Sequence, residues 1–394
     1  MKWTARRVAL AAVVRALQIV SGRRDAHVRA REWWNRRRAR RRLAPTSRRS
    51  LSVRRLLVCK TEQRGDVLLA IPALRGLRAA HPGARLVVLG APWSVEILGA
   101  ISEVDEVIVL DHPPLSFESS RGPSASERST LRDRIVAGGF DLAVDLSADP
   151  WTIELLAEAG IPRIVGPAGT SADARLHASV AIPTDLHRVE AMLAIAALAG
   201  ASPGDATPRI AIPEAAQQEA ARAIAGLGLD RPFVVVHPGG RALKRWPIER
   251  WVELVEGLLT GSSEGIVLLA GPDEPGVAEA FAATRASGRV HLWPGGSFLA
   301  VGELLCRSRL VVGNDSGVAH LAAAVGATTV TLFGPAHVSQ WAPRSARGVA
   351  ISTDESCSYP CWPAVYGEPC SHHRCLRKLS VDRVLAEVRT RLSG

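Results

Sequence analysis

The sequence predicts an α/β protein built from two doubly wound parallel sheets. From about residue 54 to residue 392, short β-branched apolar runs alternate with amphipathic helical segments, which is the pattern of strand–helix–strand units. The Pro-punctuated stretch 203–213 interrupts this alternation once, and 394 residues are enough for two domains. We therefore expect two Rossmann-like domains facing each other across a cleft, into which the carboxyl ends of their strands point.

The first domain is expected over residues 51–212. Short apolar runs bounded by polar or turn-forming residues predict strands at 56–59, 86–89, 107–110, 142–146 and 163–165. Helices are predicted at 66–80, 152–159 and 188–199 because apolar residues recur there at helical spacing. The Pro/Ser-rich segment 112–128 is predicted to be a loop.

The second domain is expected over residues 213–350, followed by a Cys-rich tail and terminal helix over 351–394. Its predicted strands are 233–236, 266–269, 290–293, 310–312 and 328–333. Its predicted helices are 214–226, 248–259, 277–286, 299–306 and 321–325, and the tail ends in an amphipathic helix over 381–392.

Residues 1–50 are predicted to form a basic, amphipathic helical arm. Residues 1–55 hold 18 of the 49 Lys and Arg residues against only Asp25 and Glu32, so this segment carries +16 and the remainder carries −5 of the net +11. An apolar helix face, the pair Trp33-Trp34 and an Arg cluster favour a helix lying on an anionic membrane surface. A solvated arm and nonspecific nucleic-acid binding are the alternatives, although the acidic body disfavours nucleic acid as a partner.

The sequence also predicts where the protein acts. No run of 18 apolar residues is present, and the segment 8–20 is interrupted by Arg15 and followed by no small-residue cleavage site. We expect a cytoplasmic protein, peripheral on the inner face of the cell membrane.

Six cysteines divide into two groups. Cys59 and Cys306 stand alone in apolar surroundings and are predicted to be reduced core residues. A Cys-x3-Cys-x8-Cys-x4-Cys cluster near the C-terminus is compatible with a structural zinc site, with free thiols or with disulfides, and zinc is the favoured interpretation. Its members are Cys357, Cys361, Cys370 and Cys375.

The stretch Gly313–His320 predicts an anion-binding turn. A buried strand enters it, an Ala-rich helix leaves it, and two glycines with cap-forming residues lie between. Such a turn directs free backbone N–H groups toward an anion at a helix N-terminus. Asp315 is placed either to cap the helix or to contact a ligand.

Three further residues lie in turns that follow predicted strands. Asp66 in Arg64-Gly65-Asp66 is either a helix N-cap or a cleft carboxylate acting as general base. The stretch His237–Pro247 has glycines that permit close approach and Lys244 to neutralise a phosphate, but it lacks both the dinucleotide and the P-loop spacing. Glu274 is either a ribose ligand or a solvated turn carboxylate.

Together these stretches resemble glycosyltransferase family 9, the bacterial ADP-heptose:lipopolysaccharide heptosyltransferases. The matching pieces are Arg64–Leu68 with Pro72, His237–Gly239 with Lys244–Pro247, Asn314–Gly317 with His320, and Phe333–Pro335. The resemblance spans about residues 54–392 and implies a GT-B fold with inverting, metal-independent sugar transfer, a nucleotide-sugar donor bound mainly by the second domain, and no catalytic cofactor. Gly239-Gly240, where hydroxyl residues are frequent in the family, and the Arg-rich arm depart from the family pattern.

Carried over by position, Asp66 matches the family's base and Lys244 offsets charge on the departing diphosphate. Asp315 would hold sugar hydroxyls, while the amides of Ser316 and Gly317 and the side chain of His320 would meet the phosphates. For His320 a satisfied residue inside its helix is the alternative. The remaining predicted donor-binding residues are His237, Gly239 and Glu274.

The predicted function is therefore transfer of a sugar, with heptose the expected one, from a nucleotide diphosphate to a lipid-linked or cell-envelope polysaccharide acceptor. Participation in lipopolysaccharide biosynthesis, with ADP-heptose as donor, follows from the resemblance. The rival hypotheses are a non-catalytic nucleotide-sugar or nucleic-acid binding protein and an oxidoreductase, the latter disfavoured by the glycine pattern.

Overall fold

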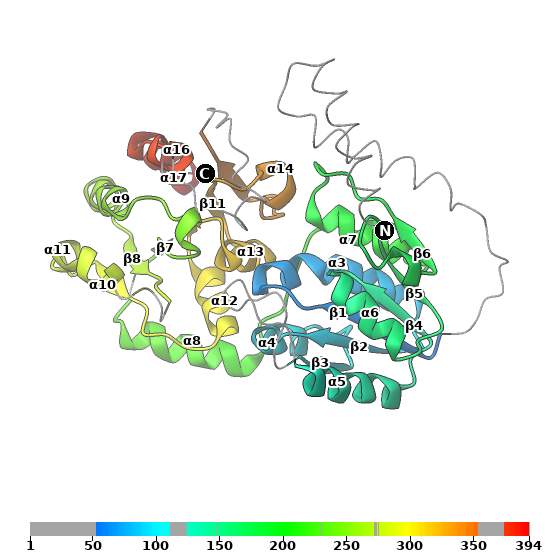
Figure 1. Ribbon diagram of the computed structural model, residues 1–394. Helices are drawn as coiled ribbons and strands as arrows, with labels where there is room; N and C mark the ends of the chain where they lie inside the picture. The colour runs from blue at the N-terminus through cyan, green and yellow to red at the C-terminus, as the bar shows by residue number, and fades with distance from the viewer. Residues whose placement is uncertain are drawn as a thin grey trace, which may run out of the picture.

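The computed structural model describes residues 53–110, 124–147, 149–229, 231–271, 274, 276–353 and 374–393. These residues form two six-stranded parallel sheets covered by helices, with strand orders β3-β2-β1-β4-β5-β6 and β12-β11-β10-β7-β8-β9 (Figure 1). The prediction of two doubly wound parallel sheets is thus confirmed. The predicted arm at residues 1–50 lies outside the described residues.

The first sheet and its helices run in alternation along the chain. Its strands are β1 (Arg55–Lys60), β2 (Arg85–Gly90), β3 (Glu106–Val109), β4 (Leu142–Asp145), β5 (Ile164–Pro167) and β6 (Ala178–Val180). The helical segments are α3 (Arg64–Ala80), η1 (Pro92–Ser94), α4 (Val95–Gly99), α5 (Ala125–Gly138), α6 (Pro150–Glu158), η2 (Asp173–Arg175) and α7 (Arg188–Ala197).

The second sheet shows the same alternation of strands and helices along the chain. Its strands are β7 (Phe233–His237), β8 (Gly265–Leu268), β9 (Val290–Leu292), β10 (Leu310–Asn314), β11 (Thr329–Leu332) and β12 (Gly348–Ile351). The helical segments are α8 (Glu214–Gly226), η3 (Ala242–Lys244), α9 (Ile248–Gly261), α10 (Gly276–Ala280), α11 (Ala282–Arg285), α12 (Phe298–Arg307), α13 (Gly317–Ala324), α14 (Val338–Trp341), α16 (Arg374–Arg377) and α17 (Val381–Ser393).

Three local predictions are wrong. The loop predicted to reach residue 128 ends earlier, because a Ser124–Glu127 capping box begins α5 at Ala125. Helix α13 begins at Gly317 rather than at residue 321, so the turn after β10 is shorter than expected. Cys306 is exposed, because α12 buries positions 299–302, 304 and 305 and turns residue 306 toward solvent, whereas Cys59 is buried as predicted.

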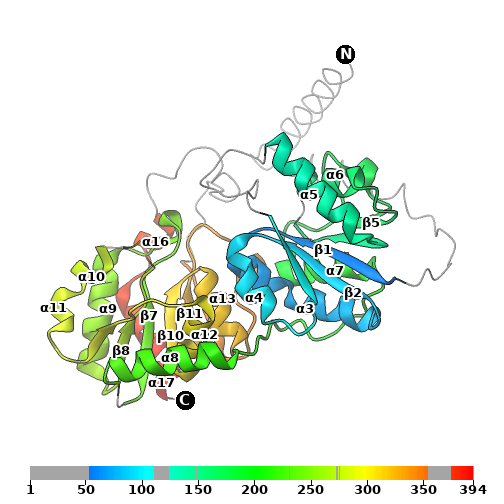
Figure 2. The same cartoon turned by 90° about the horizontal axis from the view of Figure 1, so that it is seen from below.

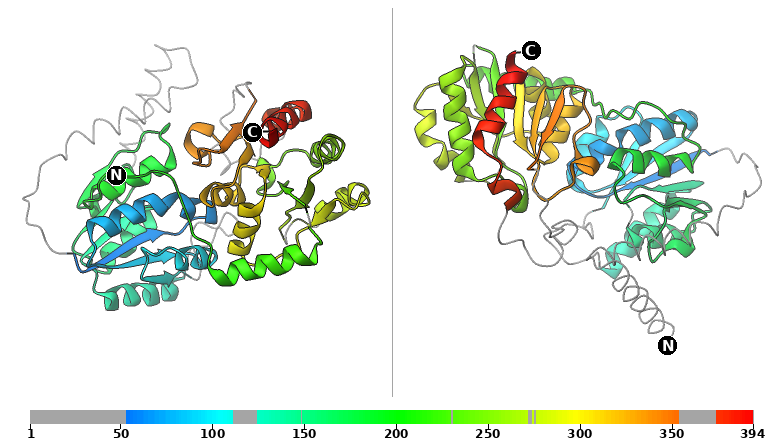
Figure 3. Two further views of the ribbon diagram at one scale, coloured as in Figure 1. Left: turned by 180° about the vertical axis from the view of Figure 1, so that it is seen from behind. Right: turned by 90° about the horizontal axis from the view of Figure 1, so that it is seen from above.

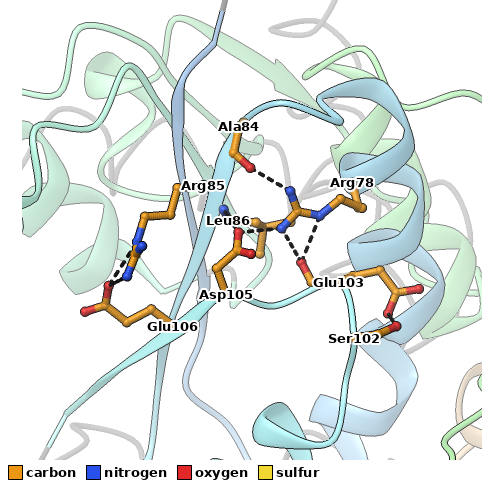
Figure 4. Close-up of polar contacts among 8 residues, drawn as sticks. All are labelled: Arg78, Ala84, Arg85, Leu86, Ser102, Glu103, Asp105 and Glu106. Carbon is orange, nitrogen blue, oxygen red and sulfur yellow. Dashed lines mark hydrogen bonds and ion pairs between the residues drawn. The ribbon is translucent and has the colours of Figure 1, made fainter.

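Helix α3 is fixed at its C-terminal end by a cluster of polar contacts at the amino edge of the first sheet (Figure 4). The guanidinium of Arg78 donates to the carbonyls of Ala84 and Glu103 and to the carboxylate of Asp105, at 2.5–3.1 Å. Asp105 also accepts from the amide of Leu86 in β2 at 2.6 Å. These contacts hold the far end of α3 to the sheet, so that its N-terminus is held at the carboxyl edge.

The two domains share a packed interface. One apolar cluster extends from the first sheet through α3 to α12, α13 and the second sheet, and α13 lies against α3 (Figures 1 and 2). The Glu96 carboxylate of the first domain accepts from the amides of Phe298 and Leu299, at 3.1 and 2.6 Å, and so satisfies two free donors at the start of α12. This contact fixes α12 relative to α4.

The chain ends on the second domain. Helix α17 packs beside α9, with Val384 and Val388 buried in the same apolar cluster as Trp251 and Leu254 (Figure 3). Within the described part of the chain, no helix combines the length and apolar character needed to cross a bilayer.

Asp145 gives a pH-dependent test of this fold. It is fully buried at the end of β4, where burial raises its pKa to about 7 and the Thr152 hydroxyl, which donates to it at 2.9 Å, opposes this rise. Because the pKa in the unfolded chain is about 3.9, the stabilising contribution of Asp145 is complete below about pH 4. It is lost as the pH rises through about 7. In urea unfolding, Asp145→Asn is expected to be about 2–4 kcal/mol more stable relative to wild type at pH 8 than at pH 4.

The matched control is Asp141→Asn, just before the start of the same strand. The amides of Arg54 and Arg55 donate to Asp141 and lower its pKa, so this variant is expected to lose stability relative to wild type as the pH rises. An Asp145→Asn stability difference that does not change with pH would contradict the assignment of a protonated buried carboxyl.

Candidate functional site

An ion pair of the candidate site joins two turns at the carboxyl edge of the second sheet. Strands β7 and β10 are neighbours, with Gly313 opposite His237, so the turns that follow them lie side by side. Lys244 of η3 donates to Oδ2 of Asp315 at 2.6 Å, and the two side chains are only 12% and 4% exposed. Sequence reasoning predicted both residues at the site, and the structure brings them together.

Asn314 joins the same two turns. Its amide nitrogen donates to the carbonyls of Pro238 and Gly239 at 2.7 and 3.0 Å, and its oxygen accepts from the amide of Trp246 at 3.1 Å. Every hydrogen bond stabilises the turn after β7 against β10, and Asn314 is fully buried. Asn314 lies inside the motif Asn314–Gly317, but no local feature of the sequence indicates that it joins two turns.

Glu274 stabilises the turn that follows β7 through hydrogen bonds from outside that turn. Its side chain is 8% exposed and accepts from the amides of Gly240 and Gly271 at 2.7 and 2.9 Å and from Arg245 at 3.2 Å. A Cβ on Gly239 would lie 2.0 Å from this carboxylate, which explains the glycine there. The alternative that Glu274 is a solvated turn carboxylate is therefore wrong, and its role as a ribose ligand stays a prediction.

His237 is part of the packing beneath the site. It ends β7, is 6% exposed, and its Nδ1 lies 2.8 Å from the carbonyl oxygen of Leu269. Burial lowers its pKa, and a Cβ on Gly313 would meet it at 3.1 Å. The structure therefore shows a buried imidazole that supports the turn, and its predicted contact with a donor stays a prediction.

The N-terminus of α13 lies beside the Lys244–Asp315 pair. Ser316 is the N-cap residue and its side chain makes no capping bond, so Asp315 lies before the cap and the prediction of an Asp315 cap is wrong. Ser316 Oγ and His320 Nδ1 are buried and have no hydrogen-bond partner among the described residues. The alternative of a satisfied His320 is therefore wrong. Burial lowers the pKa of His320 to about 4, so the ring is neutral near pH 7.

Asp66 approaches this group of residues from the first domain. It lies in the first turn of α3, whose N-cap is Gln63, so the alternative that Asp66 is the N-cap is wrong. Burial raises the pKa of Asp66. The positive charges of Lys60, Arg188 and Lys244 lower this pKa, and the negative charge of Glu62 raises it. The effect of Lys244 on the pKa of Asp66 comes from the second domain.

Glycine contacts bring the two domains together at this point. A Cβ on Gly65 would lie 2.9 Å from Cδ2 of His320, and one on Gly317 would lie 3.4 Å from the amide nitrogen of Gly65. The N-termini of α3 and α13 therefore meet almost backbone to backbone. Because both termini carry free N–H groups and a partial positive charge, their meeting favours an anion beside it.

Two groups near Asp66 were missed by sequence reasoning. Lys60 is buried at the end of β1 and forms an ion pair with Glu62 at 2.9 Å. Arg188, at the start of α7, lies over the Trp341 ring of the second domain at 5.1 Å. In the sequence, Lys60 stands out only as a charged residue at the end of an apolar strand. No sequence feature indicates a role for Arg188.

The predicted zinc site stays a prediction. Of its four cysteines, Cys375 in α16 is half-buried, and its backbone carbonyl accepts from the Thr353 hydroxyl at 3.2 Å. Cys357, Cys361 and Cys370 lie outside the described residues.

The arrangement suits recognition of an anion flanked by a general base. A buried ammonium, the start of α13 and unpartnered polar atoms converge at the edge of the second domain. The first turn of α3, whose N-terminus meets that of α13, adds the carboxylate of Asp66, which burial makes a better proton acceptor.

Comparison with known proteins shows which family and which solved structures this chain is similar to. The profile of glycosyltransferase family 9 (heptosyltransferase) matches residues 128–364, more than half of the chain. Lipopolysaccharide heptosyltransferase 1 of Salmonella typhimurium is 28% identical over 299 residues, covering 71% of this chain and 88% of that protein.

Two solved structures share the fold. Escherichia coli ADP-heptose lps heptosyltransferase II has a TM-score of 0.68 at 23% identity, covering 86% of this chain and 98% of that one. E. coli heptosyltransferase WaaC with ADP-2-deoxy-2-fluoro heptose has a TM-score of 0.64 at 23% identity, covering 85% and 99%. The predicted GT-B fold is confirmed.

The contact between Gly65 and His320 can be tested by a double-mutant cycle. Ala at an open helix position stabilises by up to about 1 kcal/mol relative to Gly, but at Gly65 the new methyl would meet a buried ring. We expect Gly65→Ala to lower the free energy of unfolding by about 1–3 kcal/mol. In a His320→Ala background the same change should cost less, because only the Gly317 Cα, at 3.3 Å, then remains close to the new methyl.

Chemical denaturation of the four proteins measures the coupling. Gly99→Ala is the matched control, since no atom lies within 4 Å of a Cβ added at this helical glycine. Equal effects of Gly65→Ala with and without His320 would contradict the proposed contact.

Proposed function

The chain belongs to glycosyltransferase family 9, and we propose that it transfers heptose from ADP-heptose to a lipid-linked or cell-envelope saccharide acceptor. As a member of this family it is a glycosyltransferase. The observation that carries the proposal is the close approach of two helix N-termini from different domains: that of α3, whose first turn holds Asp66, and that of α13, which follows the Asp315 paired with Lys244. The named relative that acts on lipopolysaccharide and the structure holding an ADP-sugar analogue support the choice of donor and acceptor class.

In the proposed donor complex the diphosphate lies at the start of α13. The amides of Ser316 and Gly317 and the unpartnered Nδ1 of His320 would donate to phosphate oxygens. His320 is neutral when unliganded, with a pKa of about 4, and its ring can carry the donor hydrogen on Nδ1. Asp315, held by Lys244, would accept hydrogen bonds from sugar hydroxyls.

Asp66 is the proposed general base. In an inverting transfer the acceptor hydroxyl attacks the anomeric carbon from the face opposite the leaving diphosphate, and its proton must be removed during the attack. A half-buried carboxylate whose pKa is raised by burial is a stronger base than one in water. Its place in the first domain, across from Lys244, puts it on the acceptor side.

Charge on the leaving group would be stabilised by the protein rather than by a required metal. Lys244 is buried and held at 2.6 Å from Asp315, so its ammonium is already oriented before the donor arrives. Together with the N-terminal partial charge of α13 it supplies a positive potential where the diphosphate departs. We propose that no cofactor takes part in catalysis.

The acceptor is proposed to be reached at the inner face of the cell membrane. The basic residues 1–50 would bind anionic lipid headgroups and keep the enzyme peripheral to the bilayer. Membership in a glycosyltransferase family disfavours the non-catalytic binding protein and the oxidoreductase as alternatives.

Substitution of the proposed base tests the proposal most directly. Asp66→Asn keeps the size of the side chain but cannot accept the acceptor's proton. We expect the rate of heptose transfer from ADP-heptose to a bacterial lipid extract to fall by at least about 100-fold, while ADP affinity by calorimetry stays within about threefold of wild type. Asp133→Asn on the exposed face of α5 is the control. Transfer at the wild-type rate would remove Asp66 from the mechanism.

Lys244 is expected to act on the leaving nucleotide. Loss of a charge-assisted contact to phosphate should weaken ADP binding about 10- to 100-fold in Lys244→Ala, measured by isothermal titration calorimetry. Because this change leaves Asp315 buried without its partner, the double variant Lys244→Ala/Asp315→Asn separates lost phosphate contact from an unpaired carboxylate. Unchanged ADP affinity in both variants would be incompatible with a phosphate role, and Arg307→Ala on the surface of α12 is the charge-loss control.

A further inference from the structure

Lys60 is a buried lysine that the proposed mechanism does not use. It is the last residue of β1, is 1% exposed, and its ammonium lies 2.9 Å from Oε1 of Glu62. A lysine this deeply buried is uncommon unless it is paired. A buried ion pair is also a poor source of stability, because desolvation of both charges offsets their attraction. The pair therefore requires an explanation other than stabilisation of the fold.

Glu62 is held rigidly on its other side. Its Oε2 accepts from the amide of Thr61 at 3.0 Å and from the Ser147 hydroxyl at 2.9 Å, and its carbonyl accepts from the Trp93 indole at 2.8 Å. Ser147 follows β4, the strand beside β1. The carboxylate thus bridges two strand ends and cannot move away from Lys60 without breaking several hydrogen bonds.

The pair lies where the first sheet reverses its order. From β1 the chain proceeds to β2 on one side, whereas β4 and β5 lie on the other, and ligands of such sheets bind at this crevice. The first turn of α3, with Asp66, follows the pair directly. Two opposite charges therefore lie at the same strand end, four and six residues before the proposed base in the chain.

We propose that Lys60 and Glu62 are positioning residues for Asp66, an opposed pair of charges that sets the pH range in which the Asp66 carboxylate is ionised. The catalytic consequence rests on the proposed function, whereas the effect on the ionisation of Asp66 does not. Lys60 favours the charged form of the Asp66 carboxylate, and Glu62 favours its protonated form.

The other charges that face Asp66 are already engaged. Arg188 from α7 stacks on Trp341, and Lys244 from η3 is paired with Asp315. Of the four charged groups that act on the pKa of Asp66, Lys60 has the largest effect and Glu62 the next, after burial itself. The pair at the end of β1 is consequently the part of the surroundings whose alteration should move the ionisation of Asp66 most.

Carbon-13 NMR of the full-length protein labelled at aspartate carboxyls tests this directly. The Asp66 resonance is identified by its loss in Asp66→Asn. Lys60→Met is expected to raise the titration midpoint of Asp66 by about one pH unit, and Glu62→Gln to lower it by about one unit. Lys60→Arg should restore the wild-type midpoint, because it keeps the charge.

A matched pair distant from the site provides the control. Arg309 and Glu264 form an ion pair at 2.9 Å at the amino edge of the second sheet, so Arg309→Met and Glu264→Gln should leave the Asp66 midpoint unchanged. If Lys60→Met fails to fold, Glu62→Gln still tests the predicted downward shift, and Lys60→Arg tests the predicted unchanged midpoint. An Asp66 midpoint that stays within about 0.2 units in Glu62→Gln overturns the inference.

The pH profile of transfer separates the inference from the proposed function. If Asp66 is the base, the acidic limb of kcat/KM for ADP-heptose should move with the NMR midpoint, upward in Lys60→Met and downward in Glu62→Gln. A merely structural role would lower the rate at every pH without moving the limb. If Asp66→Asn remains active, the base assignment fails, and the NMR midpoints still decide whether the pair governs Asp66.

Discussion

The contact of Gly65 with Gly317 and His320 is the constraint from which the geometry of the site follows. Two helices from different domains begin at the same place, and a side chain larger than hydrogen at Gly65 would meet the His320 ring at 2.9 Å. Asp66 is the next residue after one glycine, and Asp315 lies two residues before the other. The approach of the backbones therefore decides how far the carboxylate of the first domain is from the polar groups of the second.

Both sheets contribute this contact from equivalent positions. In the first, the order changes between β1 and β4, and in the second between β10 and β7. Lys60, Glu62 and Ser147 lie at the first crevice, and Lys244, Asp315 and Asn314 at the second. A doubly wound sheet leaves such a crevice open because neighbouring strands send their helices to opposite sides, and here the two crevices are turned toward each other.

Contacts far from the site fix the positions of the two crevices relative to each other. Arg78 ties the C-terminal end of α3 to the first sheet, and Glu96 of the first domain binds the start of α12 in the second. At the opposite side of the interface, His187 Nε2 donates to the carbonyl of Ala342 at 2.9 Å, and Arg344 pairs with Glu190. Because both ends of the interface are fixed, the site residues are positioned by rigid helices, which hold catalytic groups more precisely than loops do.

The sequence by itself determined the alternation of strands and helices, the two domains and the turns that carry Asp66, Lys244 and Asp315, because strand ends and helix starts leave local signals in apolar periodicity and glycine placement. The role assigned to each turn residue came from resemblance to a family. Local signals could not show that α13 begins at Gly317, that Asp315 precedes its cap, or that Glu274 braces Gly239. Those facts, together with the burial of Lys60 and the meeting of Gly65 with His320, depend on segments as much as 250 residues apart, and only packing of the tertiary structure decides which distant groups share one desolvated space.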